Sequence, residues 1–179
     1  MDSLSRPNDG FNGDFSVYVY ILYGISRKAT ERTEPNRFGI RKKYWQQILP
    51  LLNNTNLFAN VNPTKDHWLG TGAGIGGVSY TLVVTKTHVR IELTISTSSK
   101  KTNKLYFKKL FKNKETIENT FGQALVWEEL PDNKMSRIKI EMQSVNLFKE
   151  IDWKSMNEFI VFNLPKFENA IQPYIKVLK

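Results

Sequence analysis

The pattern of apolar and polar positions predicts two β-hairpins. Apolar residues occupy every second position over residues 78–85 and again over residues 88–96, with a short polar turn between them. A period of two is typical of strands that bury one face, and the short turn makes the two strands antiparallel neighbours. Residues 124–130 and 137–142 repeat the pattern around Asp132-Asn133-Lys134, whose residue types favour a turn.

Other segments carry apolar residues at the spacing of an amphipathic helix, three to four residues apart. They are residues 38–53, 104–120 and 156–178. Pro50 predicts a kink or an early end in the first helix, because proline lacks the amide hydrogen that a helix interior needs. Pro165 and Pro173 predict that the last helix is kinked or broken, and Gly122 is placed to end the middle helix as a left-handed cap.

The order of these elements, α-ββ-α-ββ-α, indicates an α+β fold. We expect an antiparallel sheet of two hairpins, with four or five strands, and three helices. The helices at 104–120 and 156–178 are expected to cover its apolar face. Residues 38–179 are expected to form this single α+β domain, after an N-terminal tail, strand and linker in residues 1–37. The side chains predicted to be buried are Leu82, Ile91, Leu93, Phe107, Leu110, Phe121 and Ile138.

Residues 15–23 read FSVYVYILY, a run of β-branched and aromatic residues. This composition predicts a strand that is apolar on both faces, so both faces need cover. If the strand lies at a sheet edge, another chain is expected to cover it. The segment is therefore interpreted as a contact for a homodimer or for a partner protein.

Composition excludes several kinds of site. The chain has 179 residues and no cysteine, so disulfides and thiolate chemistry are ruled out. The two histidines, His67 and His88, lack partners at ligand spacing, so no metal site is predicted, and no cofactor is expected. The chain shows neither a signal peptide nor an apolar run that could span a bilayer, so we expect a cytoplasmic protein without a membrane partner.

Positive charge is concentrated in one segment. The net charge is +9, and residues 100–119 alone carry seven lysines and two glutamates. Lys101, Lys104, Lys108 and Lys112 follow one another at helical spacing and predict a stripe flanked by Lys109. Such a stripe could follow a phosphate backbone, and the ordinary alternative is a solvated helix face.

A second basic cluster, Arg41-Lys42-Lys43, lies near the start of the first predicted helix. Positive charge at a helix start opposes the helix dipole, so these residues are predicted to face an anion and to extend the lysine stripe.

The glycine-rich residues 70–77 are predicted to be a flexible loop that leads into a strand. Gly72, Gly74 and Gly77 match the dinucleotide-binding spacing, but a strand follows them where that site requires a helix. A loop that needs positive φ or close backbone contact is the preferred interpretation, and an anion-binding loop of backbone amides is the alternative.

Catalytic patterns are weak in this chain. A restriction-type nuclease needs Glu or Asp, any residue and Lys on a strand, where the carboxylates hold a metal. Glu-x-Lys is absent, and Asp-x-Lys occurs only in the predicted turn at Asp132 and before the last helix at Asp152. No nuclease activity is therefore expected. Arg90 and Arg137 lie on polar strand faces, where we expect pairing with neighbouring carboxylates such as Glu92 and Glu141.

Several short motifs are collectively specific. They are Asp66-x-Trp68, residues 72–80, Arg90-x-Glu92-Leu93, Asn103-Lys104, Lys114-x-x-Ile117-Glu118-x-x-Phe121-Gly122, Trp127-Glu128-x-Leu130, Ser136-Arg137-Ile138 and Asp152-Trp153. With the closing helix they resemble the bacterial family of unknown function DUF4268 over roughly residues 38–179. Longer members look like a restriction-nuclease-like region followed by this domain. The resemblance implies a role connected with DNA or with defence. The family has no assigned activity.

These observations favour a non-enzymatic basic module associated with nucleic acid, DNA or RNA, which binds through the lysine-rich helix. The alternative is a protein-interaction or oligomerisation module that does not bind nucleic acid. An enzyme whose site is assembled in space is the third interpretation. Trp68, Tyr80 and Trp127 are expected to belong to the core rather than to stack on bases.

Overall fold

The computed structural model describes residues 37–52, 55–176 and 178, so the predicted strand at 15–23 lies outside the described residues. The helices are α2 (Arg37–Ile48), α3 (Lys100–Phe111), α4 (Lys114–Phe121) and α5 (Trp153–Ile175), with short 3-10 helices at Leu49–Leu52 and Glu150–Asp152. The strands are β1 (Trp68–Gly72), β2 (Val78–Val84), β3 (His88–Ile95), β4 (Val126–Glu128) and β5 (Ser136–Gln143).

The strands form one five-stranded antiparallel sheet in the order β1-β2-β3-β5-β4. Both predicted hairpins are confirmed, with Leu82 opposite Ile91 in the first and Trp127 opposite Ile138 in the second. The hairpins join through β3 and β5, where Leu93 lies opposite Ile138. The α+β class is therefore confirmed, with the fuller order α-βββ-αα-ββ-α among the described residues.

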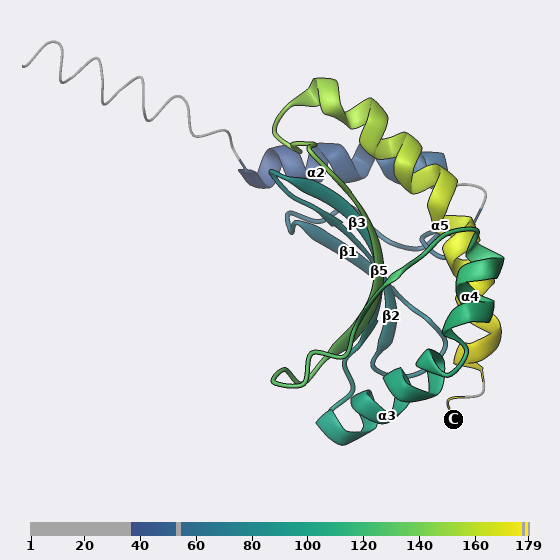
Figure 1. The fold of residues 1–179 in the computed structure, drawn as a ribbon. Helices are drawn as coiled ribbons and strands as arrows, with labels where there is room; N and C mark the ends of the chain where they lie inside the picture. The colour runs from purple at the N-terminus through teal and green to yellow at the C-terminus, as the bar shows by residue number, and fades with distance from the viewer. Residues whose placement is uncertain (1–36, 53–54, 177, 179) are drawn as a thin grey trace, which may run out of the picture. The chain divides into compact units, whose positions relative to one another are not determined.

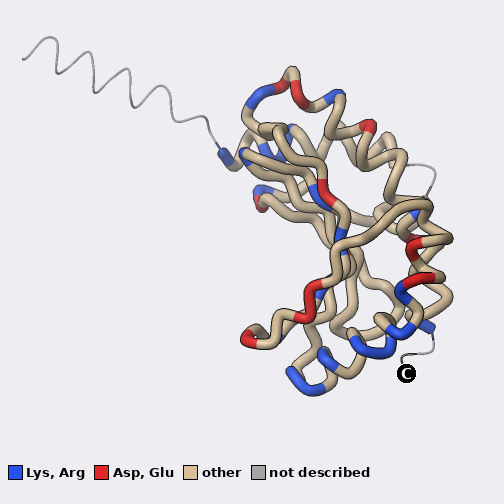
Figure 2. Tube along the Cα trace, in the orientation of Figure 1, with Lys and Arg blue, Asp and Glu red and all other residues tan. Residues whose placement is uncertain are grey.

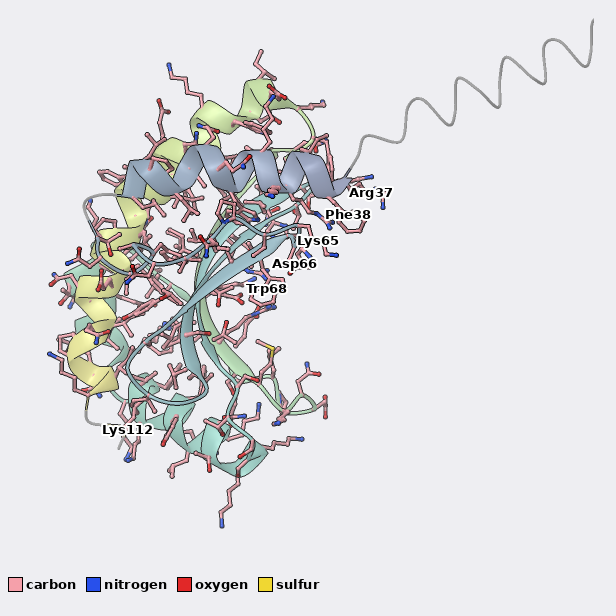
Figure 3. All side chains as sticks on the ribbon, turned by 180° about the vertical axis from the view of Figure 1, so that it is seen from behind. Arg37, Phe38, Lys65, Asp66, Trp68 and Lys112 are labelled. Atoms are coloured by element: carbon pink, nitrogen blue, oxygen red, sulfur yellow. The ribbon has the colours of Figure 1, made fainter. Side chains whose placement is uncertain are left out.

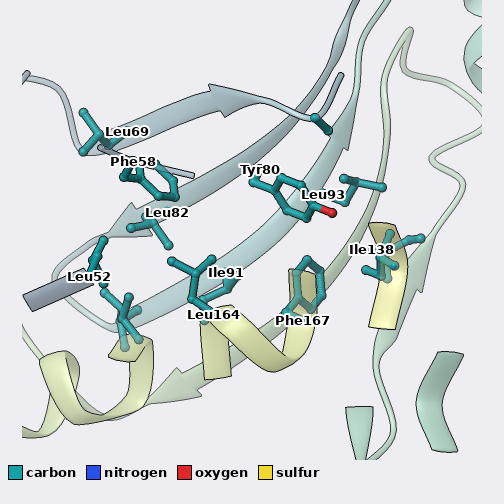
Figure 4. Close-up of a cluster of buried hydrophobic side chains, with 14 of the residues drawn as sticks. Leu52, Phe58, Leu69, Tyr80, Leu82, Ile91, Leu93, Ile138, Leu164 and Phe167 are labelled. Atoms are coloured by element: carbon teal, nitrogen blue, oxygen red, sulfur yellow. The ribbon is translucent and has the colours of Figure 1, made fainter. Parts of the chain in front are cut away.

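Among the described residues, helices cover one face of the sheet and leave the other face open (Figure 1). Figure 1 shows α4 and α5 along the covered face, with α2 near one end of the sheet and α3 near the other. Figure 4 shows side chains of β2 and β3 meeting Leu164 and Phe167 of α5. All seven side chains predicted to be buried are at most 5% exposed, because the apolar positions of the strands and helices meet in this layer.

The structure corrects the prediction that residues 70–77 form a loop. Trp68–Gly72 is the strand β1, which pairs antiparallel with β2. Only Leu69 of this strand lies in the core, and glycines fill two of its five positions, which hides the alternation. Backbone pairing with the edge of β2 outweighs the low strand propensity of glycine.

The structure also divides the predicted helix 104–120 into α3 and α4. The first begins earlier than expected, at Lys100, where the Ser99 hydroxyl accepts a hydrogen bond from the amide of Thr102 at 3.2 Å. The break lies at Lys112 and Asn113, and asparagine competes with helix hydrogen bonding through its own side chain. Gly122 ends α4 at φ 96°, which confirms the left-handed cap.

Proline has different effects in the first and last helices. The α-helical part of α2 stops at Ile48 and Pro50 lies in the following 3-10 helix, as the sequence predicted. Of the kink or break expected in α5, the break is wrong, since the helix runs from Trp153 to Ile175 through both prolines. Ten buried residues hold α5 against the rest of the domain, and such packing stabilises a helix more than propensity does. Among the described residues no helix has the length and hydropathy to cross a membrane.

Candidate functional site

The exposed lysines of α3 form the largest concentration of positive charge along the chain. We define the α3 basic face as Lys101, Lys108, Lys109 and Lys112, all of which are exposed. Figure 2 shows this blue segment at one end of the domain. Lys101, Lys108 and Lys112 are two turns and one turn apart and so follow one line along the helix. The exposed Leu105 lies beside that line, so the surface is basic with an apolar element.

Most of the lysines of the α3 basic face are not neutralised by contacts within the described residues. The side chains of Lys101 and Lys112 make no ion pair or hydrogen bond with a described residue, whereas Lys108 lies 3.6 Å from Glu129 at the surface. Within the described part of the chain, the Nζ of Lys109 donates only to the carbonyl of Leu178, at 3.4 Å. The first turn of α3 carries no acidic residue to balance the helix dipole. An anionic partner would relieve this unfavourable arrangement.

Lys104, the remaining member of the predicted stripe of four lysines, is used inside the domain. Its Nζ donates to the carbonyls of Leu130 and Met135, both at 2.7 Å, to the carbonyl of Glu129, and to the Ser136 hydroxyl at 3.0 Å. The three carbonyls belong to the connection between β4 and β5, and Ser136 is the first residue of β5. Lys104 therefore holds the β4–β5 connection onto α3 and is not a free cation for a ligand.

The neighbouring Asn103 extends the same link. Its side chain is fully buried and accepts hydrogen bonds from the amide and hydroxyl of Thr97, at 2.8 and 2.7 Å. Its amide group donates to the carbonyl of Lys134 at 2.9 Å. The start of α3 is therefore tied to the end of β3 on one side and to the β4–β5 connection on the other.

Arg41, Lys42 and Lys43 do not extend the α3 basic face. They lie on α2, and Figures 1 and 3 place α2 at the opposite end of the domain from α3 and Lys112. Lys43 pairs with Glu150 at 2.6 Å, Arg41 donates to the carbonyl of Lys65 at 3.4 Å, and Lys42 is exposed. The sequence places these clusters about sixty residues apart and holds no information on which end of the sheet each occupies.

The glycine loop lies between β1 and β2. Gly72 ends β1, while Gly74 and Gly77 have φ values of 91° and 78°. A Cβ on Gly77 would lie 2.6 Å from the Cα of Thr97, so both positive φ and close backbone contact occur here. Anion binding by this loop stays a prediction.

Charged side chains line the open face of the sheet. Arg90 pairs with Glu92 at 2.8 Å and with Glu141 at 3.8 Å. Arg137 pairs with Glu128 and lies 3.7 Å from Glu92. The sequence-based expectation that Arg90 and Arg137 pair with carboxylates of neighbouring strands is thus confirmed, and the alternation of the strands was the signal.

Lys139 completes this network through Glu128 at 3.2 Å and Glu141 at 3.1 Å. Three cations and three carboxylates balance one another, so this network itself has no net charge to attract a nucleic acid. Among the described residues no group of three acidic or histidine side chains is placed to hold a metal ion. The network is best explained as stabilising the exposed side of β3, β4 and β5.

Burial alone would raise the pKa of Glu128 and Glu141, but hydrogen bonds and positive charge from the network outweigh it. Arg137 and Lys139 lower the pKa of Glu128, and Lys139 does so most strongly for Glu141. A carboxyl pKa that is lower in the folded chain stabilises the fold above its ordinary value, about 4.5. That contribution is lost as the pH falls through the folded pKa.

We therefore expect stability to decrease as the pH falls to the ordinary carboxyl pKa, about 4.5, and further below it, and Glu128→Gln to reduce this dependence on pH. Urea unfolding at several pH values measures the effect. Glu158→Gln is the control, because Glu158 is exposed and has no ion pair with a described residue. An unchanged acid dependence in Glu128→Gln would contradict the expectation.

The three aromatic residues predicted for the core have different surroundings in the structure. Tyr80 is fully buried and donates to Gln172 at 2.9 Å, and Trp127 packs edge-on against Phe107 and Phe111. For Trp68 the prediction is wrong, since 50% of its surface is exposed. It is the first residue of β1, opposite Val83, on the face of the sheet that no described helix covers. Figure 3 shows Trp68 on the same side of the domain as Lys65 and Phe38.

Comparison with known proteins identifies the family and no activity. The model of a domain of unknown function, DUF4268, matches residues 40–175, the stretch from α2 to the end of α5. No curated protein and no solved structure matches the chain. All motifs that carried the sequence resemblance lie inside the matched region. The chain therefore belongs to the DUF4268 family.

Proposed function

We propose that this domain is a non-enzymatic module that binds nucleic acid through the α3 basic face. The observation that carries the proposal is the line of Lys101, Lys108 and Lys112, which meets one surface carboxylate, Glu129, among the described residues. A line of lysines fits the regularly spaced phosphates of a nucleic-acid backbone, because each lysine contacts a phosphate as a point charge. Leu105 beside the line offers an apolar contact for sugars or bases.

The expected binding is weak and without sequence preference. Lysine contacts to phosphate release counterions, and each contact adds about 0.9 to the slope of log affinity against log salt concentration on duplex DNA. Four lysines would give a slope of about 3.6 and an affinity that is about micromolar or weaker at physiological salt. Phosphates carry no sequence information, so DNA and RNA of any sequence should bind alike.

Changing Lys101, Lys108 and Lys112 together to Gln should lower the salt slope by about 2.7 and weaken binding to all sequences equally. Lys104 is left unchanged, so the link between α3 and the β4–β5 connection stays intact. Fluorescence anisotropy of labelled DNA and RNA, titrated with salt, measures the effect.

The matched control changes Lys42, Lys149 and Lys154 to Gln, which removes the same charge from exposed positions on or near α2 and α5. This control should bind as the unchanged protein does. Absence of binding by the unchanged protein at low salt would refute the proposed function. Equal loss in both triple variants would refute the α3 basic face as its site.

A second candidate function, self-association, is favoured by a free strand edge. β4 pairs only with Arg137–Lys139 of β5, so Ile140–Gln143 have no strand on that side among the described residues. The exposed Phe162 and Val126, at 63% and 46%, line the groove beside this edge. An unpaired edge with apolar neighbours can add a strand from a second copy. A dimer that persists in high salt and is lost on Phe162→Asp would favour this candidate, and sedimentation velocity measures it.

A further inference from the structure

A hollow of about 430 Å³ lies at the corner where α3 ends and α4 begins (Figure 1). The residues that line it are Phe111, Lys112, Lys114, Glu115, Glu118 and Asn119. Lys112 also belongs to the α3 basic face, so the hollow adjoins the lysines that are proposed to bind phosphates. Its volume lies in the usual range for small-molecule sites. A ligand bound along α3 can therefore place one of its groups in this hollow.

Phe111 offers an exposed aromatic ring at the hollow. The residue is 47% exposed, yet its ring packs in an aromatic cluster. It stacks on Phe107, with 5.9 Å between the ring centres and 23° between the planes, and it meets the ring of Trp127 edge-on at 5.5 Å. These contacts hold the orientation of Phe111 before a ligand binds, which lowers the entropy cost of binding.

A lysine lies over the Phe111 ring. The Nζ of Lys114 is 5.7 Å from the ring centre, and its side chain has no ion pair or hydrogen bond with a described residue. An exposed cation–π contact stabilises less than a base stacked on an aromatic ring, so a base can replace the ammonium group on Phe111. The displaced ammonium group would stay beside the ligand, where it can pair with a phosphate.

The charges of the hollow favour a neutral group inside it. Two lysines and two glutamates belong to the lining, which therefore has no net charge. Glu118 is fixed in place, because its Oε1 accepts hydrogen bonds from the amide of Leu125 and the indole of Trp127, both at 2.9 Å. A phosphate beside this carboxylate would be repelled, whereas the N–H groups of a base can donate to it. Phosphates therefore fit the α3 basic face, and a base fits the hollow.

We propose that an unpaired base of a single-stranded nucleic acid stacks on Phe111 in this hollow while its phosphates lie along the α3 basic face. Such binding rests on the proposed function, and it adds a contact that a duplex cannot make. In a duplex the faces of the bases are stacked on one another, so no base face is free to meet Phe111. Every base has such a face, so the contact brings no sequence preference.

Three DNA ligands of equal length test the site: a single strand of thymidines, a single strand in which every base is absent, and a duplex. Fluorescence anisotropy at low salt measures their binding. The unchanged protein should bind the thymidine strand at least about fivefold more tightly than the abasic strand, because one stacked base contributes that much. This comparison needs no variant, so it tests the proposal even if a substitution at Phe111 prevents folding.

Phe111→Leu should remove the advantage of the thymidine strand and leave binding of the abasic strand and of the duplex unchanged, because it removes the ring and no charge. Phe111→Tyr keeps an aromatic ring and should keep the advantage. An unchanged advantage in Phe111→Leu would overturn the assignment of the base to this residue.

Phe38→Leu is the matched control. Phe38 is 57% exposed and has the Nζ of Lys65 over its ring at 5.5 Å, so its surroundings are of the same kind. It lies on α2, at the opposite end of the domain from Lys112 (Figure 3). This variant should bind all three ligands as the unchanged protein does. Equal loss of the thymidine advantage in Phe38→Leu and Phe111→Leu would contradict the proposed site.

The outcomes separate the base site from the proposed function. Equal binding of the thymidine and abasic strands by the unchanged protein would overturn base stacking and leave phosphate binding at α3 intact. No binding of any of the three ligands at low salt would overturn both and favour a protein partner for this surface. The α3 triple variant should weaken binding of all three ligands, whereas Phe111→Leu should weaken binding of the thymidine strand alone.

Discussion

Lys104→Met is expected to destabilise the domain by about 3 kcal/mol. The variant removes the donor shared by the carbonyls of Glu129, Leu130 and Met135 and leaves them without their bond to Nζ. Losing hydrogen bonds from a charged donor costs about 1.5–3 kcal/mol each, and water entering the partly exposed site offsets part of the sum. A loss of this size is a large share of the roughly 5–15 kcal/mol that stabilises a typical domain.

Chemical denaturation followed by tryptophan fluorescence measures this effect. Lys108→Met is the matched control, one turn further along α3, where the lysine is 66% exposed and makes only a surface pair with Glu129. Exposed pairs contribute about 0–1 kcal/mol, so this control should change stability little. If the two variants are equally stable, Lys104 does not hold the β4–β5 connection.

Gly77→Ala is expected to destabilise the domain by about 2–5 kcal/mol. A residue with a side chain at φ 78° costs about 1–2 kcal/mol. The new Cβ would also lie 2.6 Å from the Cα and 2.8 Å from the amide nitrogen of Thr97, and relieving such overlap costs about 1–3 kcal/mol more. The backbone of Thr97 has little freedom to move, because Ser96 donates to the carbonyl of Gly77 at 2.7 Å.

Variants at two nearby glycines, Gly76 and Gly74, separate the cost of the positive φ from the cost of the close contact with Thr97. A Cβ on Gly76 meets nothing within 4 Å and its φ is not positive, so Gly76→Ala should be close to neutral. Gly74 has φ 91° and open space, so Gly74→Ala should show only the backbone cost. Thermal and urea unfolding of the three variants measure the series. Equal stability of the Gly74 and Gly77 variants would contradict the close contact with Thr97.

The residues that carry the family resemblance hold the domain together at its connections. Glu118 accepts hydrogen bonds from the amide of Leu125 and the indole of Trp127, both at 2.9 Å. Trp153 donates to the carbonyl of Leu147 at 2.6 Å, and Asp152 accepts from the amide of Asn146 at 2.8 Å. With Asn103 and Lys104 they form a structural framework. The family motifs therefore explain how this chain folds better than they identify a ligand site.

The hairpins and the buried face were predictable because their signal is local. A period of two places successive side chains on opposite faces of a strand, so Ile91 and Leu93 point to the core wherever the strand lies. The pairing of Arg90 and Arg137 with carboxylates followed from the same alternation. The strand β1 was missed because its glycines carry no side-chain pattern and its order comes from pairing with β2.

By itself, the sequence determined the α+β class, the two antiparallel hairpins and the basic character of residues 100–119. Only the tertiary structure decided which lysines are free. The carbonyls that bind Lys104 lie 25 to 31 residues away, so helical spacing could not separate it from Lys101 and Lys108. The same holds for Arg41, which lies far from α3 and beside Lys86 in a cavity. Charge and spacing are properties of a segment, whereas the partner of each charge depends on which distant segments the core brings together.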